Sequence, residues 1–360
     1  MARPQLKLGL VGLGTWAGKG HLPVYLGSRL KPFVQVSALC SRSLDKARQW
    51  CAEYGIQNAY ADYSEMLRKE RLDVVAVCTP DSLHTDYVLM ALDAGAHVIV
   101  EKPLATSTDK CSRIWEKAQK TGRKVITLYH KRADPLWIEA RQIARPGAYG
   151  PLQMGWAEIS NPVTVPTGSY FTSDMTALTD ANWFLGTHFY DLLRYITGLN
   201  PSSVYARKYY GKLRDLGYNV PDAIKADMIF ENNASLSFLL AWNLPQNVPA
   251  LTKQRMTLHF QEGELELDGM RRGMSNFGPQ GYFYANPYFL QETPAGLSGY
   301  GASFLEDSLI YLYDPEHSPK AALPSLEDAW WATAMAEAVQ ESARSEATAT
   351  ISRPPSSIRP

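Results

Sequence analysis

The chain has 360 residues, enough for two domains of about 150 residues each. Hydrophobic residues make up 45% and charged residues 20%, which is ordinary for a soluble globular protein. Lysine plus arginine and aspartate plus glutamate both number 36, so the formal net charge is zero. This balance excludes strong attraction to nucleic acid or to an anionic membrane, and no apolar run approaches the roughly 18 residues of a membrane-spanning helix.

The cysteines and the N-terminal residues indicate a cytoplasmic protein. Four widely spaced cysteines form no C-x-x-C pair, so we expect free thiols instead of disulfides or a zinc site: Cys40, Cys51, Cys78 and Cys111. Residues 1–7 lead into a strand without the apolar core of a signal peptide. Five histidines also lack metal-ligand spacing, so no metal is predicted: His21, His97, His130, His259 and His317.

A glycine-rich segment follows the first predicted strand, which covers 6–11. It reads Gly12-Leu13-Gly14-Thr15-Trp16-Ala17, the G-x-G-x-x-A form of the dinucleotide fingerprint. In this pattern the first glycine allows a tight turn, the second lets the backbone approach a pyrophosphate, and the small last residue lets a helix pack on the strand. We therefore expect Gly12, Gly14, Thr15 and Trp16 to bind a nicotinamide dinucleotide.

The end of the second predicted strand, 34–40, bears on the choice between NAD and NADP. An NAD-binding fold carries an acidic residue here for the ribose 2′-hydroxyl, whereas this chain reads Ser41-Arg42-Ser43. Arg42 could clamp a 2′-phosphate, Ser41 could donate to it, and Lys46 lies one helical turn on. The pattern favours NADP. If Arg42 instead stacks on adenine or faces solvent, NAD stays open.

Strands and helices alternate through the rest of the first 128 residues, which predicts a doubly wound parallel sheet. Strands are expected over 73–78, 97–100 and 124–128, and helices over 44–54, 63–69, 82–94 and 106–121. Two polar segments directly follow buried strands, where open α/β sheets bind ligands: Thr79-Pro80-Asp81-Ser82-Leu83-His84 and Glu101-Lys102-Pro103.

The pattern changes after residue 128 to an α+β domain, expected over 129–351, with a large, mostly antiparallel open sheet. Its strands are expected at 152–161, 203–208, 224–230, 234–241, 255–260 and 264–267. Its helices are expected at 135–143, 183–197, 302–313 and 326–342. Glu231-Asn232-Asn233 is typical of a hairpin turn, and the Pro/Ser-rich 352–360 is expected to be a loose tail.

The order of these motifs resembles the glucose-fructose oxidoreductase/inositol dehydrogenase/rhizopine catabolism (Gfo/Idh/MocA) family over nearly the whole chain. The resemblance is carried by Gly12-x-Gly14-x-x-Ala17, Thr79-Pro80-Asp81-x-x-His84, Glu101-Lys102-Pro103 and Gly186-Thr187-His188-Phe189-Tyr190-Asp191. It implies a Rossmann domain that holds NAD or NADP through the fingerprint, Thr79, Pro80, His84, Glu101 and Lys102. It also implies a C-terminal domain whose sheet often forms homodimers or homotetramers.

By the same resemblance, Lys102 is the catalytic lysine and His188 the second acid/base group, with Asp191 beside it as a substrate-binding residue. Oxidising a carbinol carbon requires removal of the proton from its oxygen, and a lysine or histidine with a pKa near neutrality can accept it. His188 and Asp191 are three residues apart and share a helix face. Taken alone, this pair would favour a helix-surface pair or a buried structural histidine over a site, whereas the lysine motif favours the site.

One position departs from the family pattern. Relatives often carry an aspartate four residues before the histidine, where this chain has Phe184. Asp180 is eight residues before His188 and cannot replace it on simple helix geometry. Lys102 and His188 must then suffice, or Tyr190 assists, or redox activity has been lost. Phe184 and Trp183 would offer an apolar wall to a substrate, or would simply be core aromatics.

Three functions are consistent with these observations. The first is an oxidoreductase, NADP-favoured, acting on a small polyhydroxylated substrate such as a sugar or cyclitol. The second is a hydrolase that uses a bound NAD transiently to cleave glycosides, as some relatives do. The third is a non-catalytic nucleotide or sugar sensor of the same fold, which Glu101-Lys102-Pro103 speaks against.

Overall fold

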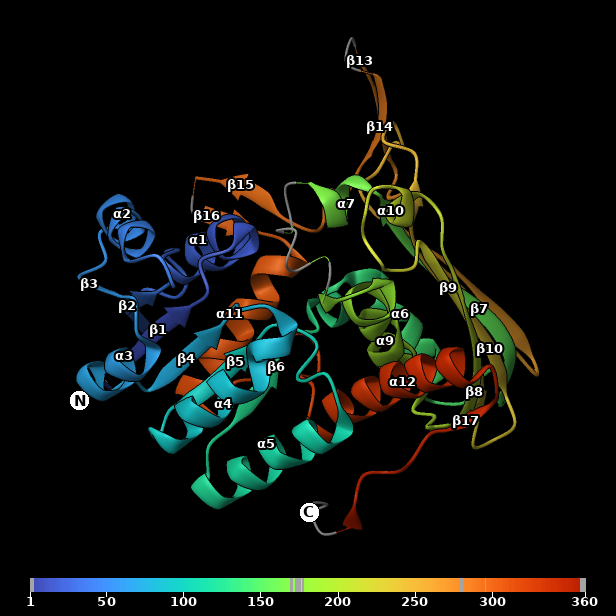
Figure 1. Ribbon diagram of the computed structural model, residues 1–360, viewed down its shortest axis with the longest axis horizontal. Coiled ribbons are helices and arrows are strands. Elements are labelled where there is room, and N and C mark those ends of the chain that lie inside the picture. The colour runs from blue at the N-terminus through green and yellow to red at the C-terminus, as the bar shows by residue number, and fades with distance from the viewer. Residues whose placement is uncertain are drawn as a thin grey trace. The chain divides into compact units, whose positions relative to one another are not determined.

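The computed structural model describes residues 3–168, 171, 176, 178–278, 281–294 and 296–356. The chain forms two compact units, each assembled from separate stretches (Figure 1). The first unit contains the residues up to Ala133, Phe289–Ala329 and the residues from Pro355 onwards. The second contains Asp134–Tyr288 and Trp330–Pro354.

The first unit is built on a six-stranded sheet with the order β3-β2-β1-β4-β5-β6, in which every neighbouring pair is parallel. The order reverses at β1 and β4, and a ligand crevice lies outside the carboxyl ends of the strands at such a point. The strands are β1 Leu6–Val11, β2 Val34–Cys40, β3 Asn58–Tyr60, β4 Val74–Val77, β5 His97–Val100 and β6 Val125–Thr127. This confirms the predicted doubly wound parallel sheet.

The helices of this unit begin and end where the sequence supplies caps. Ser43, Asp62 and Ser107 each accept a backbone N–H of the first turn, and Gly55 and Gly122 end two helices in the left-handed conformation. The helices are α2 Leu44–Tyr54, α3 Tyr63–Glu70, α4 His84–Asp93 and α5 Thr108–Thr121. Shorter turns are the π-helix η1 Ala17–His21, α1 Leu22–Tyr25, and the 3₁₀ helices η2 Asp81–Leu83 and η3 His130–Ala133.

A late segment of the chain completes the first unit. It contains the hairpin of β15 Gln291–Thr293 and β16 Gly296–Ser298, followed by α11 Tyr300–Tyr313. α11 packs against α1 and η3, and Arg29 pairs with Glu306 and Asp307 at 2.9 and 3.3 Å. The expected division into 1–128 and 129–351 therefore differs from the compact units, because the buried face of α11 finds its partners in the N-terminal unit.

The second unit is built on a seven-stranded mixed sheet with the order β12-β11-β7-β10-β9-β8-β17. Only β7 and β10 run parallel, so the sheet is mostly antiparallel, as expected. The strands are β7 Leu152–Pro162, β8 Pro201–Tyr209, β9 Ala223–Phe230, β10 Ser235–Leu244, β11 Lys253–Phe260, β12 Gly263–Asp268 and β17 Ala349–Thr350. Asn233 forms the expected turn between β9 and β10 with φ +65°.

Helices cover one face of this sheet (Figure 1). They are α6 Pro135–Ala144, α9 Thr187–Thr197 and α12 Leu326–Ser345, which crosses the boundary between the units after Ala329. In β9, alternate residues Ile224, Ala226 and Met228 are buried on the helical side. The remaining helices are short: α7 Thr164–Thr167, the π-helix η4 Asn182–Gly186, and α10 Lys212–Asp215.

The prediction from the sequence missed or misplaced some elements. The expected helix 183–197 begins as the π-helix η4 and becomes α-helical only at Thr187. The hairpin of β13 Met274–Gly278 and β14 Gly281–Ala285 was missed because its strands lack an alternating buried face. Ile351, immediately before the expected tail, donates its N–H to the carbonyl oxygen of Ser202. Within the tail, Arg353 pairs with Glu231 at 3.3 Å, and residues 357–360 lie outside the described part.

Candidate active site

The glycine-rich turn after β1 presses its backbone against the loop after β4. Gly12 has φ +94°, and a Cβ there would lie 2.5 Å from the backbone carbonyl of Cys78 and 2.7 Å from the backbone nitrogen of Thr79. Gly14 differs, because a Cβ there would meet nothing within 4 Å. The first glycine is thus required by close packing. The second leaves backbone open to a ligand, as the fingerprint predicts.

The loop after β4 contains a buried polar atom that could bond to a ligand beside this turn. The hydroxyl oxygen of Thr79 is buried and has no hydrogen-bond partner among the described residues. A buried polar atom without a partner is costly, so a ligand that bonds to it would be stabilised. Together with the open backbone at Gly14, this atom fits the polar groups of a dinucleotide.

His84 ties this loop to the loop after β5. Its ring nitrogens lie 2.9 Å from the carbonyl oxygen of Thr79 and 2.6 Å from that of Pro103. The side chain is 1% exposed. His84 therefore supports the two loops from within, whereas the sequence predicted only a general cofactor-binding role for it.

The residues expected to select the cofactor lie after β2. Ser41 is half-buried, and its hydroxyl oxygen accepts the N–H of Ser43 at 3.3 Å. Arg42 and Lys46 are exposed, and Lys46 Nζ lies 5.4 Å from the centre of the Trp50 ring. Residues 41–43 carry no carboxylate that would repel a phosphate, and Asp45 follows in the first turn of α2, so the segment 41–43 is compatible with a 2′-phosphate.

Lys102 follows β5 and is held in a buried, charged setting. It is 9% exposed, and the Lys102–Pro103 peptide bond is cis. Burial lowers the pKa of Lys102 to about 8, against the opposing influence of the carboxylates of Glu101 and Asp81. A lysine with a pKa near neutrality can exchange protons with a substrate hydroxyl.

An aromatic cluster that the sequence did not reveal lies in the same unit. Trp16 of the fingerprint stacks on Phe289 with ring centres 5.7 Å apart and planes 2° apart, and His130 lies 5.4 Å from Phe289 and 6.3 Å from Tyr300. Burial, together with the charge of Lys131, lowers the pKa of His130 to about 3, so His130 is neutral at working pH. Phe289 and Tyr300 lie far from Trp16 in sequence, so spacing could not have found this cluster.

His188 and Asp191 lie on α9 of the second unit, 7% and 1% exposed. The preceding π-helix is capped by Asp180, whose carboxylate accepts the N–H groups of Asn182 and Trp183 at 3.0 and 3.2 Å. Tyr190 donates its hydroxyl to Asn182 at 2.7 Å and so reinforces this turn. Asp180 therefore stabilises the start of the helix and does not replace the missing carboxylate.

Phe184 packs within an aromatic group of the second unit. Its ring centre lies 4.8 Å from that of Phe171, edge to face, and 6.1 Å from that of Trp242. Phe184 stays half-buried, while the indole nitrogen of Trp242 is buried without a hydrogen-bond partner among the described residues. Phe184 is thus part of an apolar cluster at the position where the motif resemblance implies a carboxylate.

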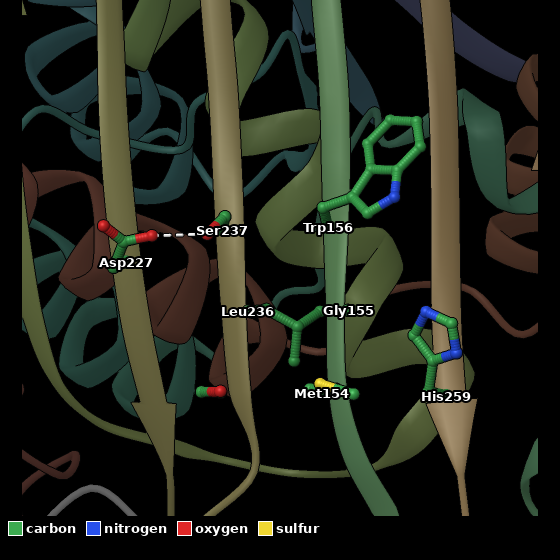
Figure 2. Close-up of a pocket in the computed structure, with 8 residues that line it drawn as sticks. Met154, Gly155, Trp156, Asp227, Leu236, Ser237 and His259 are labelled. Atoms are coloured by element: carbon green, nitrogen blue, oxygen red, sulfur yellow. Dashed lines mark hydrogen bonds between the residues drawn. The ribbon is translucent and has the colours of Figure 1, made fainter.

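A hollow lies elsewhere in the second unit, on its sheet. Figure 2 shows Trp156 of β7, Asp227 of β9, Ser237 of β10 and His259 of β11 on the sheet, with Ser237 donating to Asp227. These residues line a hollow of about 400 Å³. None of the residues predicted to be catalytic lines this hollow. Among the described residues, no group of three or more His, Cys, Asp or Glu side chains could hold a metal ion.

Two family models match the chain. Residues 6–129 match the oxidoreductase family with an NAD-binding Rossmann fold, and residues 137–266 match the GFO/IDH/MocA C-terminal domain. The chain belongs to the Gfo/Idh/MocA family of oxidoreductases. This confirms the family and the nicotinamide-binding fold inferred from the motifs.

Three individual relatives of this Gfo/Idh/MocA protein are between 16% and 32% identical to it. D-glucoside 3-dehydrogenase of Escherichia coli (strain K12) is 26% identical over 66% of this chain and 70% of its own length. An uncharacterized oxidoreductase, ORF334 of Rhizobium meliloti, is 32% identical over 40% of this chain, which spans 42% of that relative. Scyllo-inositol dehydrogenase of Lactobacillus casei, solved with NAD(H) and scyllo-inositol, has a TM-score of 0.78 and 16% identity, covering 97% of this chain and 99% of that one. In the described part of the chain, no helix is long and apolar enough to cross a membrane.

Proposed function

We propose that this chain is an NADP-preferring dehydrogenase or reductase that transfers hydride between nicotinamide C4 and a carbinol or carbonyl carbon. The observation that carries this proposal is the buried Lys102, whose pKa is lowered to about 8, at the end of β5. His84 is hydrogen-bonded to both the loop that carries Thr79 and the loop that carries Lys102. The same unit contains the open backbone of Gly14 and the Thr79 hydroxyl, which has no hydrogen-bond partner among the described residues. Lys102, His84, Thr79, Pro80, Glu101 and the fingerprint would then hold the cofactor.

The proton chemistry falls to the chain's own side chains. A bound nicotinamide would supply the hydride acceptor or donor. In the oxidising direction, the neutral amine of Lys102 accepts the proton of the substrate hydroxyl, and in the reducing direction the ammonium returns it. His188 would act as the second acid/base group. Asp191, on the same face of α9, would orient it or bind a second hydroxyl.

The proposed substrate class is a sugar, a cyclitol or a sugar derivative. Its support comes from two relatives whose names state a glucoside and an inositol as substrates. At Phe184 this chain presents an aromatic edge in place of a carboxylate, so we expect a substrate with an apolar face or substituent there. For the cofactor, Arg42, Lys46 and Ser41 would accept the 2′-phosphate of NADP.

The proposed assembly is a homodimer or homotetramer through the sheet of the second unit. The sheet face opposite the helices exposes large apolar side chains, among them Met154 at 55% and Leu239 and Ile229 at 39%. It also carries two hollows, of about 400 and 340 Å³. An exposed apolar sheet face of this kind is typical of a subunit interface.

The decisive experiment replaces Lys102 with Met and follows nicotinamide absorbance with a panel of sugars and cyclitols. Turnover should fall by about 10²- to 10⁴-fold, the usual contribution of a positioned acid or base, while NADP affinity measured by calorimetry stays nearly the same. His188→Gln should give a loss of the same order. Retained turnover in Lys102→Met contradicts the proposal. Sugar release without net absorbance change would favour the glycosidase, and binding without any chemistry would favour the sensor.

A further inference from the structure

A buried hydrogen-bonded chain leads to the residue next to Lys102. The hydroxyl of Tyr25 lies 2.7 Å from His21 Nδ1, and His21 Nε2 lies 2.8 Å from Glu101 Oε1. Because an ionised carboxylate only accepts hydrogen bonds, His21 must donate from Nε2. In the neutral imidazole, Nδ1 is then the acceptor for the Tyr25 hydroxyl, so one arrangement satisfies all three groups.

The local sequence explains how His21 reaches Glu101 from the fingerprint helix. Pro23 has no N–H and cannot bond to the carbonyl of Lys19, so an ordinary α-helical turn fails there. Leu22 donates instead to the carbonyl of Ala17, which makes the wider π-helical turn η1. Gly20 leaves room for the Trp16 ring, which meets the His21 ring edge to face at 6.4 Å. The widened turn thus directs His21 inward, where it is 0% exposed.

The Glu101 carboxylate is held at both oxygens. Oε1 is bonded to His21, and Oε2 accepts the backbone N–H of Lys102 at 3.3 Å. Burial alone would raise the pKa of Glu101, but the hydrogen bond and electrostatic influence of His21, followed by the influence of Lys102, lower it to about 2. A fixed negative charge therefore lies immediately beside the candidate catalytic amine.

We propose that His21 is the positioning residue of this site: held by Tyr25, it keeps the Glu101 carboxylate ionised and fixed, and this carboxylate sets the protonation of Lys102. The proposal rests on the proposed function of Lys102 for its effect on catalysis. Its effect on the charge of Lys102 does not depend on that function.

Other groups around Lys102 cannot replace Glu101 in this role. Asp81 of η2 also favours the charged amine but is the lesser influence, and His130 of η3 is neutral. Cys78 and Tyr25 face Glu101, but burial raises both their pKa values well above the ordinary range, so they remain uncharged. The hydrogen-bonded chain from Glu101 through His21 ends at Tyr25, which is 1% exposed. These hydrogen bonds therefore orient Glu101 and do not conduct protons to solvent.

The test measures the titration of Lys102 directly. The protein, saturated with NADP, would carry lysine labelled with ¹³C at Cε, and the Lys102 resonance would be assigned by its loss in Lys102→Met. Glu101→Gln removes the charge at nearly constant shape, and His21→Phe removes both hydrogen bonds. Since an opposite charge within about 4–6 Å moves a pKa by roughly 1–3 units, both variants should lower the Lys102 midpoint by about one pH unit or more.

Two further variants keep the test decisive. His21→Gln retains a donor for Glu101 and should restore the wild-type midpoint. His97→Gln changes a half-buried histidine at the other end of β5, bonded to the Lys124 N–H at 2.9 Å, and should leave the midpoint unchanged. An unchanged midpoint in folded Glu101→Gln and His21→Phe would overturn the proposal.

The pH dependence of kcat/KM separates this inference from the proposed function. In the oxidising direction, the limb that rises with pH should move to lower pH by the same amount as the Lys102 midpoint. If the midpoint moves while the limb does not, His21 and Glu101 still set the charge of Lys102, and the catalytic role of Lys102 fails.

Discussion

The two units hold their candidate acid/base groups in different ways. In the first, Lys102 lies in a loop at a strand end, beside the carboxylate of Glu101, which is hydrogen-bonded to His21 and to the backbone N–H of Lys102. In the second, His188 lies on a helix that follows a π-helical turn. Asp180 accepts an N–H of this turn, and Phe184 of the turn packs against the ring of Phe171. The first unit thus relies on backbone turns and charge, and the second on side-chain packing. Packing adjusts to small changes, whereas tight backbone contacts and charges do not.

The largest expected effect tests whether the tight backbone contacts of the first unit tolerate an added side chain. Gly12→Ala places a Cβ 2.5 Å from the Cys78 carbonyl in a residue with φ +94°. We expect a loss of about 3 kcal/mol or more in the free energy of unfolding, from strain and overpacking together. Gly186→Ala in η4 would meet the buried side chains of Leu240 and Tyr190, at 2.9 and 3.0 Å. It should cost about 1–2 kcal/mol, less than Gly12→Ala, because side chains can shift where backbone cannot and alanine also favours a helix.

Urea unfolding of both variants measures this contrast. Gly14→Ala is the matched control in the same turn, because its Cβ meets nothing within 4 Å. It should keep wild-type stability and weaken only nucleotide binding. Equal destabilisation by Gly12→Ala and Gly186→Ala would remove the distinction between the units.

A smaller effect concerns pH, with opposite signs in the two units. Burial lowers the pKa of His130 in the first unit to about 3, so between about pH 6.5 and 3 the unfolded chain binds a proton that the folded chain does not. Stability from this group therefore falls as the pH is lowered. Burial raises the pKa of Asp180 in the second unit, so stability from that group falls as the pH rises through the carboxyl range.

Unfolding midpoints measured from pH 3 to 7 in His130→Asn and Asp180→Asn test these signs. The first variant should lose stability less steeply on acidification than the wild type, and the second should lose a component that declines towards neutral pH. Asparagine can still cap the π-helix at position 180, so only the slope is diagnostic. The same slope change in both variants would contradict the assignment.

The smallest expected effect is on cofactor choice. Arg42→Ala removes an exposed guanidinium, so we expect little change in stability and about a tenfold loss in NADP affinity relative to NAD, the value of one charge-assisted contact. Arg48→Ala removes an exposed arginine from α2, which begins two residues after Arg42, and should leave the ratio unchanged. A calorimetric titration with both nucleotides would measure it, and an unchanged ratio in Arg42→Ala would make Arg42 a bystander.

The sequence predicted most of what local physics determines. Five of the six strands of the first unit and the motifs at Gly12 and Lys102 follow from short-range patterns. The short strand β3 was missed, and the helix expected to begin at Ser82 begins as α4 only at His84, without a side-chain cap. The link between His21 and Glu101 was not predictable, because the two residues are 80 positions apart and meet only through the fold. The return of Phe289 and Tyr300 to the first unit was hidden for the same reason.

The interrupted first unit has a consequence for synthesis on the ribosome. Its sheet is complete in sequence by Thr127, but α11, which covers α1 and η3, is not made until Tyr313. At translation rates of about 5–20 residues per second, the nascent sheet would wait roughly 10–40 s with that apolar surface uncovered. During this interval the growing chain would be a natural client for chaperones that shield apolar surface, even though the finished unit buries it.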